Sequence, residues 1–492
     1  MPTDPATPAG RGDLDPGRAL AALAEAAGPA LELGRRFAAA GNEAALVGGP
    51  VRDALLGRPI TDLDLTTDAR PERVLEVVRG WADAVWEVGI KFGTVGVRKG
   101  DHMLEVTTYR AEVYDRGSRK PEVTYGDSLA ADLVRRDFTV NAMAVTLPGL
   151  ELVDLHHGVD DLRAGVLRTP GPPEVSFGDD PLRMMRAARF AATLGLAVAP
   201  EVVEAMSAMY GRLAIVSAER VRDELVKLVL GADPRAGLTL LVGTGLASLV
   251  LPELPALALE VDEHHRHKDV YEHTLTVLER AIDLETSHEP VSGPDFVLRF
   301  AALMHDVGKP RTRRFEDDGR VSFHHHEAVG ARMTRKRMET LRFSHDEIDA
   351  VSRLVELHLR FHGYGDGEWT DSAVRRYVRD AGDLLPRLHK LTRADCTTRN
   401  RRKAERLART YDELEERIAR LSEQEELAAI RPALDGNRIM AVLGIPPGRD
   451  VGAAYSMLLE LRLDRGPMSE EDAEAALLAW WAERGGAQQA DA

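Results

Sequence analysis

The stretch Leu46-Val-Gly-Gly-Pro-Val-Arg-Asp-Ala-Leu-Leu-Gly57, followed by Thr61-Asp-Leu-Asp-Leu-Thr66, decides the fold of the N-terminal third of this chain. A short apolar strand that ends in Gly48-Gly49 lets the backbone approach a ligand closely, because glycine has no Cβ. A helix that begins near Val51 points its free N–H groups toward the same place. An anion such as a triphosphate fits there, and Arg52 adds a charged fork.

The two aspartates of the second stretch, Asp62 and Asp64, are two residues apart on a predicted strand, so both carboxylates project from one face. Two neighbouring carboxylates repel each other unless a cation lies between them. Oxygen ligands suit Mg²⁺, which can activate an attacking hydroxyl and hold a leaving pyrophosphate. Glu105, in the predicted strand MLEVTTY, adds a third carboxylate. Asp-x-Asp pairs are also common in surface turns, but the preceding Gly-Gly-x-x-Arg-Asp favours the metal site.

Composition restricts the class of protein. The 492 residues contain 44% hydrophobic and 5% aromatic residues, which suits a helix-rich protein of several domains. We find no membrane-length apolar run and no secretion signal. The single cysteine, Cys396, excludes an internal disulfide framework and a thiolate zinc site, and we expect a cytoplasmic protein. The net charge of −16 argues against non-specific coating of nucleic acid, although it allows a local basic patch.

The pattern along the chain predicts an α+β fold. Short apolar runs at 44–49, 63–67, 93–97, 102–109 and 139–146 indicate the strands of a small mixed sheet. The Pro-Gly-Pro-Pro break at 170–173 is followed by apolar residues at helical spacing, which predict a largely all-α remainder. The predicted parts are a flexible leader (1–30), the mixed-sheet domain (31–170), a helical neck (171–255), a histidine-rich domain (256–400) and a C-terminal helical body and tail (401–492).

Further motifs follow the first one in order. They are Arg135-Arg136-Asp137-Phe-Thr-Val-Asn141-Ala, then Asp154-Leu155 with Gly158 and Asp161-Leu162, then Asp180-Pro-Leu-Arg183 continuing through Arg186 and Arg189, and finally Glu219-Arg220-Val-Arg-Asp-Glu224. Together they resemble the motifs of class II tRNA nucleotidyltransferases and bacterial poly(A) polymerases over about residues 44–230. The resemblance implies a polymerase β-like nucleotidyltransferase head. It also implies nucleotide contacts from Gly48, Gly49, Arg52, Arg136, Asp137, Asn141, Asp180, Arg183, Arg186 and Arg189.

Nucleobase selection also makes chemical sense on these residues. Asp180 and Arg183 are three apart, so we expect them to share a helix face. Adenine and cytosine both present an amino donor next to an unprotonated ring nitrogen, which a carboxylate and a guanidinium can read together. Guanine and uracil present a carbonyl instead and would be rejected. The family pattern is Glu-Asp-x-x-Arg, whereas this chain has Asp179, which we expect to orient Arg183 or a neighbour.

Twelve of the sixteen histidines lie between His264 and His362. His273, His305-Asp306 and Asp395 resemble the ligand set of the HD metal-dependent phosphohydrolases, which implies a divalent metal in the histidine-rich domain. Imidazole and carboxylate ligands favour Mn, Ni or Zn over Mg. His326 and His358 match a second metal position. His324 and His325 compete for the role of His326, and His358 could equally be a helix-face histidine.

A basic stretch occurs between Arg375 and Arg409, with twelve Lys or Arg residues against four acidic ones. It is either a solvated helix face or a phosphate-binding surface. The candidate RNA-binding residues are Arg399, Arg401, Arg402, Lys403 and Arg406.

The expected function is addition of C and A from CTP and ATP to the 3′ end of tRNA, with release of pyrophosphate. Mg²⁺ would be held by Asp62, Asp64 and Glu105, and phosphohydrolysis by the HD domain is a second expectation. The alternatives are a poly(A) polymerase, an enzyme that adds only A, or a phosphohydrolase with a vestigial head. The terminal WWAERGGAQQADA lacks a basic extension, which favours CCA addition over poly(A) synthesis. The sequence does not specify the oligomeric state.

Overall fold

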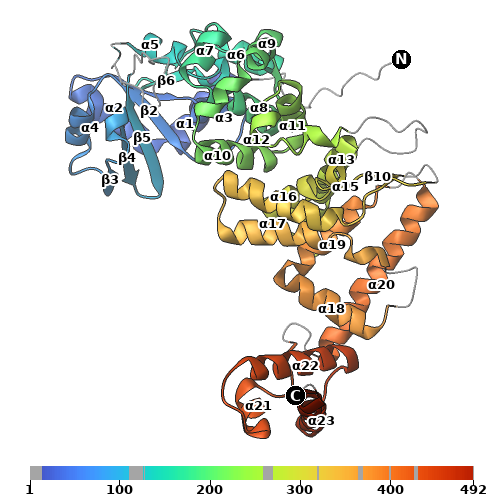
Figure 1. Cartoon of the computed structure of the whole chain (residues 1–492). Helices are drawn as coiled ribbons and strands as arrows, with labels where there is room; N and C mark the ends of the chain where they lie inside the picture. The colour runs from blue at the N-terminus through green and yellow to red at the C-terminus, as the bar shows by residue number, and fades with distance from the viewer. Residues whose placement is uncertain are drawn as a thin grey trace. The chain divides into compact units, whose positions relative to one another are not determined.

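The computed structural model describes residues 14–109, 126, 128–258, 270–317, 321–363, 369–397, 400–425 and 430–490. The chain divides into two compact units, Met1–Pro255 and Ala256–Ala492. Within the described residues, the mixed sheet belongs to the first unit, and helices dominate the second (Figure 1).

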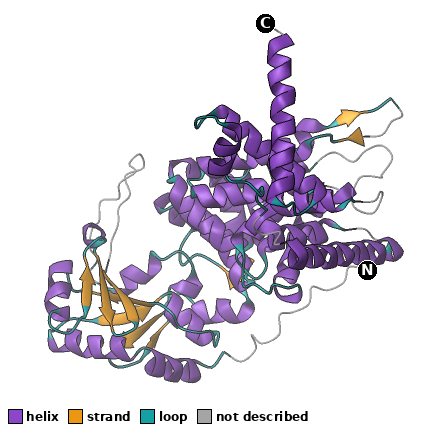
Figure 2. Cartoon of the chain, turned by 90° about the horizontal axis from the view of Figure 1, so that it is seen from below, coloured by secondary structure: helices purple, strands orange, loops and turns teal. Residues whose placement is uncertain are grey.

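The first unit contains a seven-stranded sheet over its described residues, with strand order β3-β4-β5-β2-β1-β6-β7. Figures 1 and 2 show this sheet with helices beside it. Strands β2 and β5 run parallel, whereas the other neighbouring pairs are antiparallel. The central strand β1 is buried throughout, as expected for a continuous apolar run. The strands are β1 (Ala44–Val47), β2 (Leu63–Thr67), β3 (Ala84–Trp86), β4 (Thr94–Lys99), β5 (His102–Thr108), β6 (Ala144–Leu147) and β7 (Leu152–Val153).

Helices surround the sheet and continue into the neck. Helix α8 is the most buried of those near the site; it is amphipathic in sequence and packs against α10 and α11. The α-helices are α1 (Pro16–Ala26), α2 (Gly28–Ala39), α3 (Gly49–Leu55), α4 (Pro71–Val78), α5 (Leu129–Val134), α6 (Gly158–Ala164), α7 (Pro173–Asp179), α8 (Leu182–Leu194), α9 (Pro200–Met209), α10 (Ala218–Val229), α11 (Pro234–Gly243) and α12 (Ala247–Val250). Short 3₁₀ turns η1 (Ile90–Phe92), η2 (Thr139–Asn141), η3 (Tyr210–Ile215) and η4 (Pro255–Leu257), and the small pair β8 (Val166–Leu167) and β9 (Ala197–Val198), complete this set.

The predicted flexible leader is wrong from Pro16 onward. The Asp15 side chain caps α1 by accepting from the Gly17 N–H, and a proline occupies the first turn. Leu23 and Ala27 are fully buried, so the apolar face of these helices packs into the unit. Residues 1–13 lie outside the described part of the chain.

The strand prediction at 139–146 is correct for its second half alone. Residues Thr139–Asn141 form η2 instead, because their side chains are tied to Asp161 and Asp137 and do not continue the strand alternation. The short strands β3 and β7 were not predicted.

The second unit is almost entirely helical in its described residues, with one small hairpin, β10 (Arg314–Phe315) and β11 (Val321–Ser322). A separate core of Leu434, Ile439, Ala454, Leu458 and Leu477 forms near the C-terminus. The helices are α13 (Val270–Ser287), α14 (Phe296–Met304), α15 (Lys309–Thr312), α16 (His326–Thr340), α17 (His345–Leu357), α18 (Asp371–Ala381), α19 (Leu385–Asp395), α20 (Arg401–Glu425), α21 (Gly436–Leu443), α22 (Arg449–Arg465) and α23 (Glu470–Ala490), with 3₁₀ turns η5 (Arg360–Gly363) and η6 (Gly382–Leu384). Among the described helices, none combines the length and apolarity that a membrane crossing requires.

Candidate functional site

The sheet of the first unit brings the predicted carboxylates together. Asp64 on β2 and Glu105 on β5 are register partners across the parallel strand pair, so their side chains leave the same face side by side. Asp62 lies one residue before β2 and is exposed. Burial raises the pKa of Asp64 to about 6, and the negative charges of Glu105 and Asp62 add to this effect. A divalent cation would relieve both causes, so this group of oxygen ligands fits Mg²⁺.

Two cavities flank this carboxylate group. The first, of about 520 Å³, is lined by acidic and basic side chains that include Asp64, Glu105, Arg136, Asp180, Arg183, Arg186 and Arg220. The second, of about 980 Å³, is lined in part by Gly48, Gly49, Arg52, Asp62, Asp137, Asn141 and Arg189. Asp64, Arg136, Asp137 and Arg186 border both cavities. The structure therefore places every predicted residue of the first unit's site in the lining of these two cavities, which share four residues.

The turn between β1 and α3 has the backbone that the glycines permit. Gly48 has φ 73°, in the left-handed region that favours glycine, and α3 begins at Gly49. Arg52 forms a bidentate pair with Asp53, at 2.9 and 2.8 Å, and donates to Asn141 Oδ1 at 2.7 Å. Its guanidinium is therefore fixed at the edge of the second cavity.

Asp137 connects the RRD motif to helix α8. One carboxylate oxygen accepts from the Asn141 side chain at 3.0 Å, and the other accepts from Arg186 Nε at 2.7 Å. Burial alone would raise the pKa of Asp137, but Arg186 and Asn141 outweigh burial and lower the pKa to about 2. The carboxylate is thus charged and fully engaged with protein groups, which gives it an organising role between the two cavities.

The adjacent Arg136 has a different environment. Its Nη2 donates to Asp132 Oδ2 at 3.0 Å, whereas its Nε is buried with no hydrogen-bond partner among the described residues. A buried guanidinium nitrogen without an acceptor is costly. Because Arg136 borders both cavities, its guanidinium adds positive charge to the wall that they share.

The base-reading pair is arranged differently from the prediction. Asp180 does not share a helix face with Arg183, because it lies outside α8, with φ −139° and ψ 101°. The reason is Pro181, which disfavours helical backbone at the preceding residue. Arg183, in the first turn of α8, donates to Ser176 Oγ at 2.9 Å and to the Arg135 carbonyl at 2.5 Å. Both side chains nevertheless line the first cavity.

The motif at 154–162 does not line either cavity. The Asp154 carboxylate accepts from the N–H groups of Gly158 and Val159, at 2.7 and 2.9 Å, and so caps α6. A Cβ at Gly158 would overlap the Thr139 carbonyl oxygen. This motif therefore anchors α6 against η2, which directly precedes β6.

Sequence reasoning missed two charged residues of this site, although both belong to a motif that it quoted. Arg220 lines the first cavity, and its Nη2 lies 2.8 Å from Asp180 Oδ2. Glu224 is buried, 3.1 Å from Arg189 Nε and 3.8 Å from Arg186 Nη1. Their spacing of four on an amphipathic helix was the available signal.

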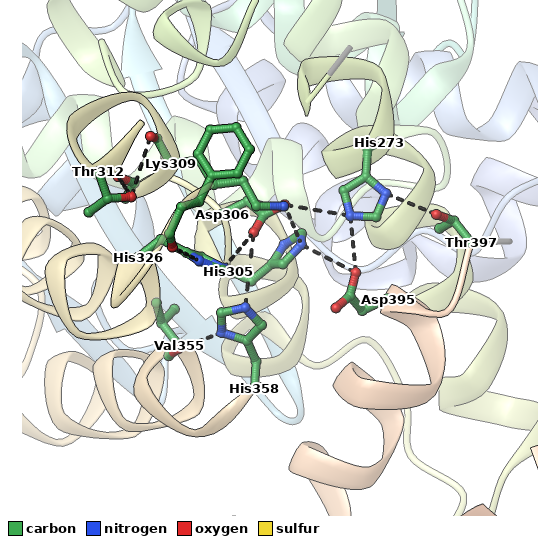
Figure 3. A network of polar contacts seen from close by, with 12 residues as sticks. His273, His305, Asp306, Lys309, Thr312, His326, Val355, His358, Asp395 and Thr397 are labelled. Carbon is green, nitrogen blue, oxygen red and sulfur yellow. Dashed lines mark hydrogen bonds and ion pairs between the residues drawn. The ribbon is translucent and has the colours of Figure 1, made fainter. Parts of the chain in front are cut away.

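In the second unit, helix ends assemble a histidine and aspartate cluster (Figure 3). His305 and Asp306 follow α14, His273 lies on α13, and Asp395 ends α19. His273 Nε2 lies 3.0 Å from Asp395 Oδ1 and 3.5 Å from Asp306 Oδ2, and His305 Nε2 lies 3.2 Å from Asp306 Oδ2. The ligand atoms of His273, His305 and Asp306 are close enough together to hold one metal ion, and Asp395 lies beside them.

Asp306 also takes part in a second group with His326 and His358. Its Oδ1 lies 3.3 Å from His326 Nε2 and 4.0 Å from His358 Nε2. His326 starts α16 and His358 ends α17, and both are buried, whereas the adjacent His325 is 86% exposed at its side chain. The structure thus places His326, and neither of its two histidine neighbours, in this cluster.

The ring orientations fit metal binding. The Nδ1 atoms of His305, His326 and His358 lie within 2.7–2.8 Å of backbone carbonyl oxygens, which makes each Nδ1 a donor and leaves Nε2 as an acceptor. The three buried Nε2 atoms have no hydrogen-bond donor among the described residues. When these rings are neutral, three Nε2 lone pairs lie near one carboxylate, an arrangement that a cation would satisfy.

The pKa values of two histidines in this cluster are shifted in opposite directions. Burial disfavours a charged His305, but Asp306 and Asp395 outweigh burial and raise its pKa. Burial and the nearby His305 lower the pKa of His358 to about 3. Lys309 Nζ lies 2.5 Å from Asp306 Oδ2 and contributes positive charge from the solvent side. A divalent metal that binds here would replace the proton on the histidine Nε2 atoms. Its positive charge would then be balanced by the carboxylates of the cluster.

The basic stretch divides into two kinds of residue. Arg401, Arg402, Lys403 and Arg406 are exposed on the first turns of α20, whereas Arg399 lies outside the described residues. The arginines at 375, 376, 379, 387 and 393 instead form ion pairs with acidic residues of the same unit. At least five of the twelve basic residues in the stretch are therefore structural.

Three family models match consecutive parts of the chain. They are the poly A polymerase head domain over residues 44–168, the probable RNA- and SrmB-binding site of polymerase A over 195–257, and the HD domain over 270–400. The divalent-metal chemistry of both sites is consistent with these matches.

Two relatives align with most of the chain. The A-adding tRNA nucleotidyltransferase of Deinococcus radiodurans is 34% identical, over 89% of this chain and 95% of that protein. The CC-adding tRNA nucleotidyltransferase of Thermus thermophilus is 33% identical, over 89% and 93%. The CCA-adding enzyme of Enterococcus faecalis is 39% identical over 46% of this chain and 58% of its own length.

Among solved structures, the Bacillus stearothermophilus CCA-adding enzyme in complex with CTP superposes with a TM-score of 0.64 and 26% identity. That alignment covers 94% of this chain and 98% of the other. The similarity therefore extends through both units and is not confined to the head.

Proposed function

The chain belongs to the tRNA nucleotidyltransferase family, and we propose that it adds C and A from CTP and ATP to the 3′ end of tRNA in the cytoplasm, building or repairing CCA with release of pyrophosphate. The observation that carries this proposal is the register pairing of Asp64 with Glu105 beside a cavity that also contains Asp180 and Arg183. The carboxylates proposed to bind metal and the pair proposed to read the base border one cavity, whose volume is within the range of small-ligand sites.

The residues of the first unit divide this work. Asp62, Asp64 and Glu105 would hold Mg²⁺, which when bound stabilises developing charge on a transferred phosphoryl group. The residues that would bind or orient the triphosphate and ribose are Gly48, Gly49, Arg52, Arg136, Asp137 and Asn141. Asp180 would accept from the amino group of C or A while Arg183 donates to the ring nitrogen. Arg186 and Arg189 would keep α8 in place through Asp137 and Glu224.

The test is incorporation of each labelled NTP, with Mg²⁺, onto tRNA transcripts that lack CCA, lack the terminal A alone, or are complete. Addition of two C and one A followed by termination supports the proposal. Long A tails on any RNA would instead indicate a poly(A) polymerase. Absence of any incorporation would contradict the proposal.

A partial activity is the second candidate, because two relatives that align along most of the chain are an A-adding and a CC-adding tRNA nucleotidyltransferase. The same three transcripts separate the cases. An A-only enzyme would extend just the transcript that lacks the terminal A, and a CC-adding enzyme would stop after two C residues.

We further propose that the histidine and aspartate cluster of the second unit is a phosphohydrolase centre for 2′,3′-cyclic phosphates or 2′-phosphates at damaged tRNA ends. Its support is the set of orphaned Nε2 atoms around Asp306. The ligand set favours Mn, Ni or Zn. Hydrolysis of 2′,3′-cyclic CMP and 2′-AMP, assayed with each metal and with Mg²⁺, tests this proposal. A metal-loaded protein that hydrolyses neither would contradict it.

A further inference from the structure

Helix α10 presents two opposite charges to the base-reading region. Arg220 and Glu224 are four residues apart and so share one face of the helix. Arg220 pairs with Asp180 at 2.8 Å, while Glu224 pairs with Arg189 of α8 at 3.1 Å. Helices α8 and α10 pack closely against each other, so α10 holds both the helix and the carboxylate that precedes it.

The backbone of Asp180 is fixed between two helices, although its conformation before Pro181 is extended. Its N–H donates to the Ser176 carbonyl at 3.2 Å, and its carbonyl accepts from the Arg183 N–H at 3.0 Å, so what is left to orient is the side chain. Its Oδ1 accepts from the Leu182 N–H at 3.0 Å, and its Oδ2 accepts from Arg220 at 2.8 Å. The orientation of the carboxylate is therefore set by two donors, and the second comes from a residue forty positions later.

We propose that Arg220 is a positioning residue for nucleobase selection, and that its ion pair with Asp180 holds the carboxylate where C and A are accepted and U and G are refused. This inference rests on the proposed nucleotide addition. Uracil and guanine present a carbonyl oxygen where cytosine and adenine present an amino group. A fixed carboxylate repels that oxygen, whereas a carboxylate released from Arg220 can rotate away and remove the penalty.

The side chains of Arg220 and Asp180 are both partly exposed, so Arg220 can be replaced to test its role with little risk of unfolding the protein. Arg220 is 55% exposed and Asp180 is 21% exposed at their side chains, so the loss of Arg220 leaves no fully buried unpaired charge. We therefore expect Arg220→Ala to fold. Arg222, on the same helix and paired with its neighbour Asp223 at 2.8 Å, is a matched control because it is not in the first cavity's lining.

The experiment measures incorporation of CTP against UTP on a transcript lacking CCA, and of ATP against GTP on one lacking the terminal A. In Arg220→Ala, we expect the preference for the correct base to fall by about tenfold to a hundredfold, the range available to one discriminating contact. Arg220→Lys should restore part of the preference, since an ammonium can pair with Asp180 without the fork geometry. Arg222→Ala should match the wild type. An unchanged preference in Arg220→Ala would overturn the proposal.

A double-mutant cycle distinguishes positioning from direct contact with the nucleotide. If Arg220 acts through Asp180, then Arg220→Ala should have no further effect on selectivity in an Asp180→Ala background. Multiplicative effects would overturn the proposal in favour of direct contact. Should the wild type add no nucleotide, equilibrium binding of CTP and UTP to the same variants tests the role of Arg220 instead. A CTP preference that Arg220→Ala does not reduce would then refute that role, separately from the failure of the proposed function.

Discussion

The two metal-ready sites of this chain are built in opposite ways. In the first unit, three carboxylates gather on and beside two interior strands of the sheet, next to open cavities. The pKa of Asp64 is raised to about 6 because Arg136 and Arg186 offset only part of the effect of its burial and of its acidic neighbours. In the second unit, buried histidines are locked through Nδ1, and their Nε2 atoms point at Asp306 before any cation arrives. The first arrangement suits an ion that enters with its substrate, whereas the second suits an ion that stays.

The largest expected effect comes from Asp64→Asn. We expect kcat/KM for nucleotide addition to fall by on the order of a thousandfold or more, because a metal contributes several kcal/mol to phosphoryl transfer and about 1.36 kcal/mol is tenfold in rate. The metal content of the second unit should not change. Incorporation assays and elemental analysis on the same preparation check both statements. Near-normal addition by a folded variant would refute the metal role of Asp64.

The reciprocal change is Asp306→Asn, which touches both ligand groups of the second unit. We expect loss of the bound transition metal with nucleotide addition retained. His326→Ala belongs to the second group alone, so it should lower the metal content by about one equivalent. His325→Ala is the matched control, since this neighbouring side chain is 86% exposed. Equal metal loss in both histidine variants would argue against the assignment of His326.

The raised pKa of Asp64 should also affect the free energy of unfolding, so this difference between the two sites can be measured as a dependence of stability on pH. In the unfolded chain this carboxyl ionises near its ordinary value of 3.8, so the fold disfavours the ionised form and loses stability as pH rises from about 4 to about 6. Without metal at pH 8, Asp64→Asn should therefore be more stable by about 1–3 kcal/mol. The difference should vanish below pH 4 and shrink with added Mg²⁺.

Thermal unfolding across pH, with and without Mg²⁺, checks this prediction. Asp101→Asn, in the exposed turn between β4 and β5, is the control for loss of a carboxylate outside the site. A destabilised Asp64→Asn at pH 8 would mean that the carboxylate is already compensated by neighbouring arginines, and the contrast between the two sites would be lost.

The predictability of the two sites differs for physical reasons. The head residues could be found in the sequence because phosphate binding and metal binding demand particular residue types at short, fixed spacings. The position of Asp180 could not, because Pro181 removes it from the helix and its partner Arg220 lies forty residues away. Five strands of the sheet were predicted from apolar runs, but β3 and β7 are too short to show any periodicity.

The number of basic residues in a stretch of sequence also overestimates the basic surface, because acidic partners can lie far away in the sequence. The arginines of α18 look like part of a basic surface, yet Arg375 forms a bidentate pair with Glu425, at 2.7 and 2.8 Å, and is 5% exposed. Its acidic partner is fifty residues away, so no local pattern reveals the pair. Similarly, three consecutive histidines left the choice of ligand open until the start of α16 placed His326 in the cluster.

The smallest expected effect tests the residues that remain exposed on α20. Replacing Arg401, Arg402, Lys403 and Arg406 with alanine should raise the KM for tRNA several-fold and reduce the salt dependence of tRNA binding by about one counterion for each phosphate that is no longer neutralised. The KM for CTP should not change, because these side chains are far along the chain from the base-reading cavity and belong to the other unit. Arg420→Ala, exposed on the same helix beyond the basic turns, is the control. If the fourfold variant binds tRNA with an unaltered salt slope, the stretch is a solvated helix face, and RNA recognition must then depend on the first unit or on other residues of the second.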